Sequence, residues 1–344
     1  MSSPWRRAWR RFCANRLGFW SLALLIVSFG ISLAAELISN DKPLVARYDG
    51  HWYFPIAQTV SDKTLGGDFE TPADYLDPLI RENLKKPGNF ALFPLNPYHH
   101  STINYFARAP SPAPPSRDNL LGTDDRGRDL LAVLLYSFRL SLVFALIVAV
   151  VCVVLGVLYG AIQGYVAGWT DIGMERFKEI WGSMPVLYML IIFSSLFSSS
   201  FGLLVILISI FEWLGISAYV RAEFLKNRTL DYVRAAKALG QSDARIMWHH
   251  ILPNSLTPVV TLAPFEMVAA IGALTSLDFL GLGMPPGTPS LGELLGQAKN
   301  NLDAWWIAIS TFAVLVVTLL LLVLIGDALR DALDPRKLLQ GDEA

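Results

Sequence analysis

The stretch LSLVFALIVAVVCVVLGVLY, residues Leu140–Tyr159, decides the fold because it holds no charged side chain over 20 positions. A helix of about 20 predominantly apolar residues crosses the hydrocarbon core of a bilayer. The composition of the whole chain agrees, since 53% of its 344 residues are hydrophobic and only 17% are charged. Soluble domains carry about 25% charged residues. We therefore expect a helical membrane protein.

Apolar regions on both sides of this stretch predict the remaining spans. Leu17–Ala35 precedes it, and Val259–Leu282 and Trp305–Ile325 follow it. Met184–Ile216 is apolar apart from one glutamate, but SSSFG at Ser198–Gly202 interrupts it, which predicts two short helices joined by a tight turn. The sequence therefore predicts six transmembrane helices.

The first of these spans has a second interpretation as a signal peptide. It follows a basic region and ends in the small residues of ISLAAE. The apolar part of a signal peptide runs over about 7–15 residues, and Leu17–Ala35 is longer, which favours a retained helix. Orientation does not separate the two interpretations, because a signal peptide enters the membrane in the same direction.

Basic residues are distributed unevenly over the loops, and short cytoplasmic loops carry the excess of lysine and arginine. The start of the chain, PWRRAWRRFCANR, has five arginines and no acid, and residues 218–258 hold six lysines and arginines. Residues 283–304 hold only Lys299. Both termini and the loop 218–258 are therefore expected in the cytoplasm.

This orientation divides the chain into four parts. Residues 1–38 are a basic cytoplasmic start with the first span, 39–130 lie outside, 131–330 form the membrane core, and 331–344 are a cytoplasmic tail. The outer part is rich in proline (ARAPSPAPPSR) and aromatics (YDGHWYFP), which predicts an irregular, extended structure with little helix. It is either a docking surface or a tether. The fold class is thus all-α, with six spans and a long extracytoplasmic segment after the first.

Motifs for chemistry are missing from the sequence. It contains no GxxxxGK[ST] phosphate loop and no GxSxG, HExxH or Cys-x-x-Cys pattern. The adjacent histidines His99–His100 and His249–His250 make poor metal sites, because neighbours on a helix point about 100° apart. A net charge of −1 argues against nucleic-acid binding. We expect no enzymatic activity, metal or cofactor in this chain.

Three acidic residues fall inside the predicted spans, where burial in lipid is costly. Glu212 and Asp278 lie where they could reach water at a span end, whereas Glu266 follows Pro264 well inside the fifth span. One interpretation is a polar lining of a translocation path that accepts cationic groups of a solute. The other is an interhelical hydrogen bond. Both stay open at the level of sequence.

The cytoplasmic loop contains the stretch DYVRAAKALGQSDARIMWHHILPN, residues Asp231–Asn254. Tyr232–Leu239 is rich in helix formers, with Asp231 placed to cap the first turn. Gly240 suits the left-handed residue that ends a helix, and a second helix begins at Ser242 or Asp243 and must end before Pro253. The pattern predicts a helix–turn–helix elbow.

The first helix of this elbow has a face of small residues. Val233, Ala236 and Leu239 lie on one stripe, with Ala235 beside them. Such a shallow face is a weak membrane anchor and fits the groove of another protein better. We therefore favour docking on a partner over a linker helix that lies at the lipid headgroups.

Three blocks of sequence carry a resemblance to a known family. The pattern A-A-x-A-L-G followed by H-I-L-P-N resembles the EAA loop of ABC importer permeases. Leu121–Leu142 and Leu277–Leu295 are similar to two segments of the peptide and nickel branch of that family. The resemblance covers roughly Asn119–Pro335. The basic start and the stretch AEL-ISNDKPL-ARYDG-WYFP resemble more narrowly the YejE-type permeases of oligopeptide and microcin C import.

This resemblance implies a type I ABC importer permease fold in the bacterial inner membrane and half of a peptide translocation path. A homologous permease would supply the other half, one or two ATPase domains would use ATP and Mg²⁺ on the cytoplasmic side, and an extracytoplasmic binding protein would deliver peptide. The elbow Asp231–His250 would be the coupling helix. The coupling residues would be Asp231, Tyr232, Arg234, Ala235, Ala236, Leu239, Gly240, Asp243, His250 and Pro253.

The sequence departs from the family pattern at two places. Arg234 stands where the EAA motif usually has glutamate, so a contact made by that glutamate is not carried over. At Leu274–Asp278 the usual E-A-A-L-S is replaced by LTSLD, which loses a glutamate and gains Asp278.

Two other classes of function compete with this one. An ion-coupled secondary transporter would use Glu266 and Asp278 as proton sites, but such transporters often show internal repeats. Leu17–Gly202 and Leu203–Ile325 show no convincing repeat. A membrane-anchored scaffold that acts through its outer segment would leave the cytoplasmic elbow unexplained.

Overall fold

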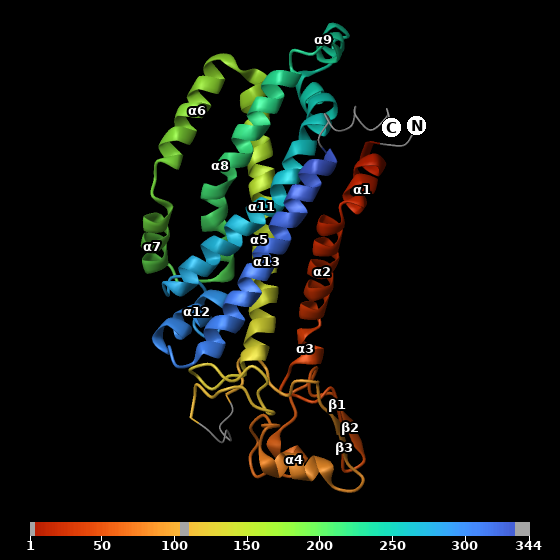
Figure 1. Cartoon of the computed structure of the whole chain (residues 1–344), viewed down its shortest axis with the longest axis vertical. Coiled ribbons are helices and arrows are strands. Elements are labelled where there is room, and N and C mark those ends of the chain that lie inside the picture. The colour runs from red at the N-terminus through yellow and green to blue at the C-terminus, as the bar shows by residue number, and fades with distance from the viewer. Residues whose placement is uncertain (1–3, 104–109, 334–344) are drawn as a thin grey trace.

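The computed structural model of the chain describes residues 4–103 and 110–333. Figure 1 shows long helices that run side by side, with a small module of strands and a short helix at one end and the helix α9 projecting from the other. The amino-terminal helix α1 and the end of α13 lie toward the α9 end. The predicted tail beyond residue 333 lies outside the described residues.

Five helices among the described residues are long and apolar enough to cross a membrane. They are α2 (Arg16–Leu33), α5 (Leu130–Val166), α8 (Phe201–Asn227), α11 (Leu252–Phe279) and α13 (Trp305–Leu333). These helices lie at five of the six predicted spans. Most run past the predicted bounds, because their ends continue beyond the apolar stretch into polar turns.

The region Met184–Ile216 departs from the prediction in part. The turn at Ser198–Gly202 is confirmed: α7 (Val186–Leu196) ends before it, and Ser200 caps α8 by accepting from the Leu203 amide at 3.2 Å. The second helix is not short, since α8 has 27 residues. A helix that the sequence did not predict, α6 (Gly168–Gly182), precedes α7, and the two lie end to end beside α8.

Three glycines let α5 and α8 approach closely. Gly156, Gly160 and Gly164 recur every four residues on α5, the small-residue spacing typical of packed membrane helices. A Cβ atom on Gly160 would lie 2.4 Å from the Ser217 carbonyl oxygen of α8, and one on Gly164 would lie 2.6 Å from that of Arg221. Any side chain there would push the two helices apart, so this pair forms the tight spine of the bundle.

The α5–α8 spine shares one hydrophobic core with α11. Phe144, Ile216 and Ile271, one from each helix, are fully buried in it. On the far side of the bundle α13 packs against α11 and α2 (Figure 1). Helix α1 (Pro4–Ala14) is followed by Asn15, whose side chain caps α2 by accepting from the Gly18 amide at 3.1 Å.

The chain between α8 and α11 forms the expected elbow, but its second arm differs from the prediction. Helix α9 (Asp231–Ala238) is followed by the single turn α10 (Asp243–Arg245) and a π-helical turn, η2 (Ile246–Ile251). The π turn runs directly into α11. The second arm of the elbow is therefore the extended start of a membrane helix and not a separate short helix.

The outer segment is a small folded module, so the prediction of an irregular, extended structure is wrong. Strands β1 (Val45–Tyr48), β2 (His51–Tyr53) and β3 (Phe90–Leu92) form an antiparallel sheet in the order β2-β1-β3. The strands β1 and β2 are joined by Asp49-Gly50, both with positive φ, a preferred hairpin turn. This sheet also corrects the all-α class, since a helical membrane core carries a small β module.

A helical layer covers one face of this sheet. It consists of the 3₁₀ turn η1 (Asp62–Leu65) and helix α4 (Pro78–Lys85). Ala46 of β1, Leu65 and Ile80 are buried together between the layers. The module therefore has its own hydrophobic core.

A short helix also replaces the loop that was expected before the last span. Helix α12 (Leu291–Asn300) is capped by Ser290, whose hydroxyl accepts from the amides of Gly292 at 3.1 Å and Glu293 at 3.3 Å. It lies at the end of the bundle near the outer module (Figure 1).

Candidate functional site

The turn of the elbow is closed by a complete set of backbone hydrogen bonds. Gly240 has φ +77°, the left-handed conformation that was predicted for it. Its amide donates to the Lys237 carbonyl at 3.0 Å, and the Gln241 amide donates to the Ala236 carbonyl at 3.2 Å. These two bonds are the Schellman cap that ends a helix. The cap reverses the chain sharply and leaves Leu239 at the tip.

The inner face of α9 belongs to the core of the bundle. Val233 and Ala236 are only 4% and 6% exposed and share the core cluster with Ile246 and Ile251 of the π turn. These two residues therefore do not form the outward face that the sequence predicts. The π turn brings large apolar side chains beneath α9, which the residue pattern of α9 alone does not indicate.

The outer surface of the elbow is small, charged and tipped by one apolar side chain. Leu239 is 81% exposed at the tip, and Tyr232 is 38% exposed. Arg234 lies 3.9 Å from Asp231, and both side chains stand in solvent. The predicted coupling residues that lie on this surface are Asp231, Tyr232, Arg234, Ala235, Leu239, Gly240 and Asp243.

Polar contacts tie the elbow to the membrane helices. The Tyr165 hydroxyl at the end of α5 donates to Asp243 at 2.5 Å, and Arg228 donates to the Tyr165 carbonyl at 2.9 Å. The imidazole of His250 lies 2.7 Å from the side-chain oxygen of Gln241 across the turn. An amide oxygen only accepts, so His250 donates. Together with the shared core, these contacts attach the elbow to α5 and α8.

Two predicted local roles are wrong. Asp231 does not cap α9, because Leu230 occupies the cap position and Asp231 is the first helical residue. Its charge still lies in the first turn, where the helix dipole favours an acid. The helix also does not end before Pro253, which lies in the first turn of α11, where proline is tolerated. The side chains of Asn254 and Ser255 donate to the carbonyls of His250 and Ile251 at 3.1 and 3.0 Å.

Glu212 of α8 and Glu266 of α11 are half-buried inside the bundle. Their carboxyl groups are close enough to interact electrostatically with each other and with the buried thiol of Cys152 on α5. The structure thus brings two of the three predicted path residues to one region, where α5, α8 and α11 meet. The sequence did not predict this pairing.

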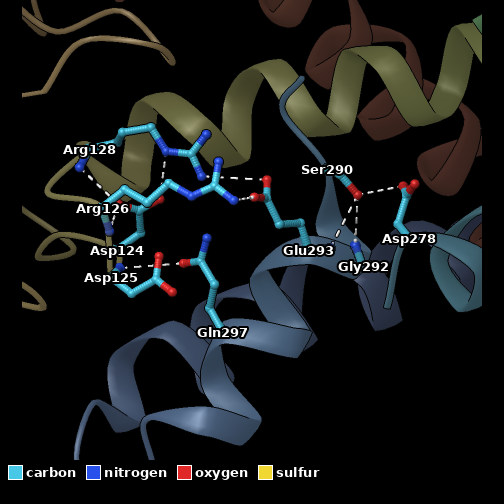
Figure 2. A network of polar contacts seen from close by, with 9 residues as sticks. All are labelled: Asp124, Asp125, Arg126, Arg128, Asp278, Ser290, Gly292, Glu293 and Gln297. Carbon is cyan, nitrogen blue, oxygen red and sulfur yellow. Dashed lines mark hydrogen bonds and ion pairs between the residues drawn. The ribbon is translucent and has the colours of Figure 1, made fainter. Parts of the chain in front are cut away.

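Asp278 lies apart from that pair and has a structural role. Its carboxylate accepts from the Ser290 hydroxyl at 2.5 Å (Figure 2). It also accepts from the Met284 amide at 2.6 Å. A Cβ atom on Gly292 would lie 2.6 Å from the Asp278 Cβ atom, so α12 packs directly on the end of α11. Asp278 therefore joins α11 to α12, and its oxygens are already occupied.

A network of charges holds the segment just before α5 against α12, and we call it the outer clamp (Figure 2). Arg128 and Asp124 are 3% and 0% exposed and form an ion pair of 2.7 Å. Glu293 of α12 lies 3.5 Å from Arg128 and 2.5 Å from the half-exposed Arg126. The Asp125 amide donates to Gln297 at 3.4 Å. The block GTDDRGRD therefore helps to hold α12 in place, together with Asp278 of α11.

Comparisons with known proteins agree with this architecture. A family described as "Binding-protein-dependent transport system inner membrane component" matches residues 153–338, and one described as "N-terminal TM domain of oligopeptide transport permease C" matches residues 3–55. The inner membrane ABC transporter permease protein YejE of Escherichia coli is 47% identical over 97% of this chain and 98% of its own. The chain belongs to this family of inner membrane permeases.

Two further comparisons bear on the permease. The peptidoglycan transport system permease protein YejE of Agrobacterium fabrum is 40% identical over 97% of this chain and 95% of its own. A structure of the MetNI methionine ABC transporter in an inward-facing conformation matches with a TM-score of 0.51 and 16% identity, covering 60% of this chain and 98% of that one. The latter shows that the membrane core has the helical fold of an ABC importer permease.

The outer clamp contains functional-site candidates that the sequence did not single out. Arg126, Arg128 and Glu293 come from blocks that carried the family resemblance, and Gln297 follows the second block, but 165 positions separate Arg128 from Glu293. A local signal for α12 was present, because Ser290 followed by Glu293 is a capping-box pattern. That pattern would have placed the helix but not the ion pairs.

Proposed function

We propose that this permease is one of two membrane subunits of an ATP-driven importer for oligopeptides. The observation that carries the proposal is the elbow: α9 is packed into the core of the bundle on one face and presents a solvent-exposed tip on the other. A partner that moves this tip moves α8 and α11 with it. ATP hydrolysis, with its Mg²⁺, belongs to a separate ATPase chain, and a second, homologous permease completes the path.

The proposed topology has six spans, with α6 and α7 as one span in two pieces. They contain 15 and 11 residues, about 22 and 16 Å of helix, so neither crosses the bilayer alone. In this topology both termini and the elbow lie in the cytoplasm, and residues 39–130 lie outside, where an extracytoplasmic binding protein delivers the cargo. The five arginines of the amino terminus and the basic elbow support this orientation.

The proposed cargo is a peptide, because the relatives are named for oligopeptide and peptidoglycan transport. Glu212 and Glu266 are the proposed lining that receives cationic groups of the cargo, while Asp278 supports the outer end. Peptide–nucleotide antibiotics of the microcin C type are proposed to use the same path.

The ion-coupled alternative has less support. Its second proton site, Asp278, is bonded to Ser290 and Met284, and the relatives are permeases of ABC transporters. Uptake into vesicles separates the two functions: we expect accumulation of a labelled peptide to need ATP and the ATPase subunits. Uptake driven by a proton gradient alone would exclude the importer.

A matched pair of surface variants tests the elbow itself. Leu239→Asp places a charge at the exposed tip, and Leu95→Asp does the same at a leucine that is 92% exposed on the outer module. We expect Leu239→Asp to lose ATPase co-purification and ATP-dependent uptake while membrane insertion stays normal. Leu95→Asp should retain ATPase co-purification. Normal uptake by Leu239→Asp would remove the coupling assignment.

A further inference from the structure

Helix α1 carries a concentrated positive surface that the transport mechanism does not use. The segment from Pro4 to Arg16 holds five arginines, and the first acid of the chain is Glu36. Arg6, Arg7, Arg10 and Arg16 are exposed. Arg6 and Arg10 lie one turn apart, so their side chains stack on one face of the helix.

Packing against α13 holds the opposite face of α1. Phe12 is 1% exposed and clusters with Ala328 and Ala332 near the end of α13. A Cβ atom on Gly18 would lie 2.1 Å from the Ala328 Cβ atom, so the junction of α1 and α2 sits directly on α13. The helix therefore cannot turn about its axis, and the arginine face is fixed outward.

The length of α2 places this face at the membrane surface. Helix α2 has 18 residues, about 27 Å, close to the roughly 30 Å of the hydrocarbon core. Arg16 must then lie at the boundary, and Arg10 stands about 9 Å beyond it, at the outer edge of a headgroup region of roughly 5–8 Å and within a Debye length of about 8–10 Å. Trp9 is 56% exposed and stacked on Phe12, as suits a side chain at the interface.

We propose that α1 is a binding site for the headgroups of anionic phospholipids in the cytoplasmic leaflet. Guanidinium groups bind phosphate through paired hydrogen bonds, and clusters of basic residues beside a membrane helix bind acidic lipids at about 1 kcal/mol per residue. The elbow α9 projects well beyond the level of α1 (Figure 1), so an ATPase docked on α9 leaves the arginine face to the lipid. The site rests on the orientation given under the proposed function.

Native mass spectrometry of the detergent-solubilised permease complex tests this site, with phosphatidylglycerol and phosphatidylcholine as probes. We expect the wild type to retain phosphatidylglycerol preferentially and a variant with Arg6→Gln, Arg7→Gln and Arg10→Gln to bind it roughly tenfold to a hundredfold more weakly. The same positions changed to lysine should keep most of the binding. Arg47→Gln, Lys85→Gln and Arg117→Gln remove three exposed charges from the outer end and should change nothing.

Each outcome decides the proposal. The proposal is overturned if the glutamine variant retains phosphatidylglycerol as the wild type does. If that variant also loses ATPase co-purification while it retains the lipid, α1 is a protein-docking helix. Lipid retention is measured without transport, so failure of peptide uptake leaves this result standing. If an impermeant thiol reagent added outside spheroplasts labels a cysteine placed at Arg7, the orientation is wrong, and the proposal falls with it.

Discussion

At the elbow the side chains of Arg234 and Asp231 are 72% and 103% exposed and lie 3.9 Å apart. In the outer clamp the side chains of Arg128 and Asp124 are 3% and 0% exposed and lie 2.7 Å apart. The exposed pair contributes little to folding, since surface ion pairs are typically worth about 0–1 kcal/mol. The buried pair is desolvated, so removal of one charge leaves the other buried without compensation. The elbow therefore leaves the charges of Arg234 and Asp231 in solvent, whereas the clamp uses its charges to hold α12 in place.

The largest expected effect comes from breaking the clamp. Arg128→Met leaves Asp124 buried without its ion-pair partner, which costs about 3–5 kcal/mol. We expect the variant to accumulate poorly and to melt at a lower temperature in detergent. Arg126→Met is the matched control, because Arg126 binds the same Glu293 but its side chain is 45% exposed.

The contrast between the two arginines decides this prediction. Arg126→Met should retain near-normal accumulation and melting. If the two variants behave alike, burial of the Arg128–Asp124 pair is not what stabilises the outer end.

A smaller effect is expected when a charge is placed beneath the elbow. Ala236 is 6% exposed, so Ala236→Glu forces a carboxylate into the core under α9 and should detach the helix. Detachment of α9 returns the carboxylate to water, so the loss should stay at about 1–3 kcal/mol, the cost typical of a buried uncharged polar group. We expect amides of residues 231–245 to exchange hydrogen much faster, with insertion and the outer clamp unaffected.

The neighbouring residue supplies the control for that experiment. Ala235 is exposed, so Ala235→Glu should leave the exchange of the elbow unchanged even if it weakens ATPase docking. Equal protection in both variants would show that α9 is not anchored through Ala236.

The two ends also differ in how far the sequence predicts them. The apolar stretch of α5 and the left-handed Gly240 follow from local composition, and both are found where expected. The burial of Ala236 depends on a π turn that brings Ile246 and Ile251 beneath α9. Periodicity within α9 carries no information about that turn, so the face of the elbow was assigned to the wrong partner.

Long-range pairing explains the remaining errors at the outer end. The outer module was expected to be irregular, but Val45 pairs with Leu92 across most of the module. The sequence Asp49-Gly50 indicates a hairpin turn. It does not indicate the third strand, because β3 has only three residues. The clamp likewise needs Arg128 and Glu293 to meet from distant segments. Composition identifies proline-rich segments and says little about what they pack against.

A pH-dependent effect is expected where the outer module joins α5. The rings of His99 and His100 are 4.1 Å apart and lie 4.9 and 4.7 Å from the ring of Tyr136. Burial lowers the pKa of His100 to about 4, helped by His99, Arg128 and Arg139, and burial also lowers the pKa of His99 despite Asp41 and Glu36.

The sign of this effect follows from the unfolded pKa of about 6.5. Between pH 6.5 and their lowered pKa values, His99 and His100 bind more protons in the undocked module than in the docked one. Docking is therefore fully stable above pH 6.5 and weakens as the pH falls toward 4. Limited proteolysis of residues 39–103 should speed up between pH 7.5 and 5, after correction for protease activity. His100→Phe should flatten this dependence, and an unchanged profile would mean that the imidazoles do not hold the module.

The smallest structural effect and the sharpest functional contrast are expected at Arg234. Its side chain is 72% exposed and lies 3.9 Å from Asp231, so Arg234→Ala should change the free energy of unfolding by no more than a surface substitution does, about 0.5 kcal/mol. ATPase docking should nevertheless weaken, because Arg234 stands on the same outward surface as Leu239. Arg234→Glu should weaken it further, because it reverses the charge at this exposed position. ATPase activity of the reconstituted complex, measured for both variants against Arg126→Met, separates these outcomes, and equal activity in all three would show that charge on the elbow plays no part in coupling.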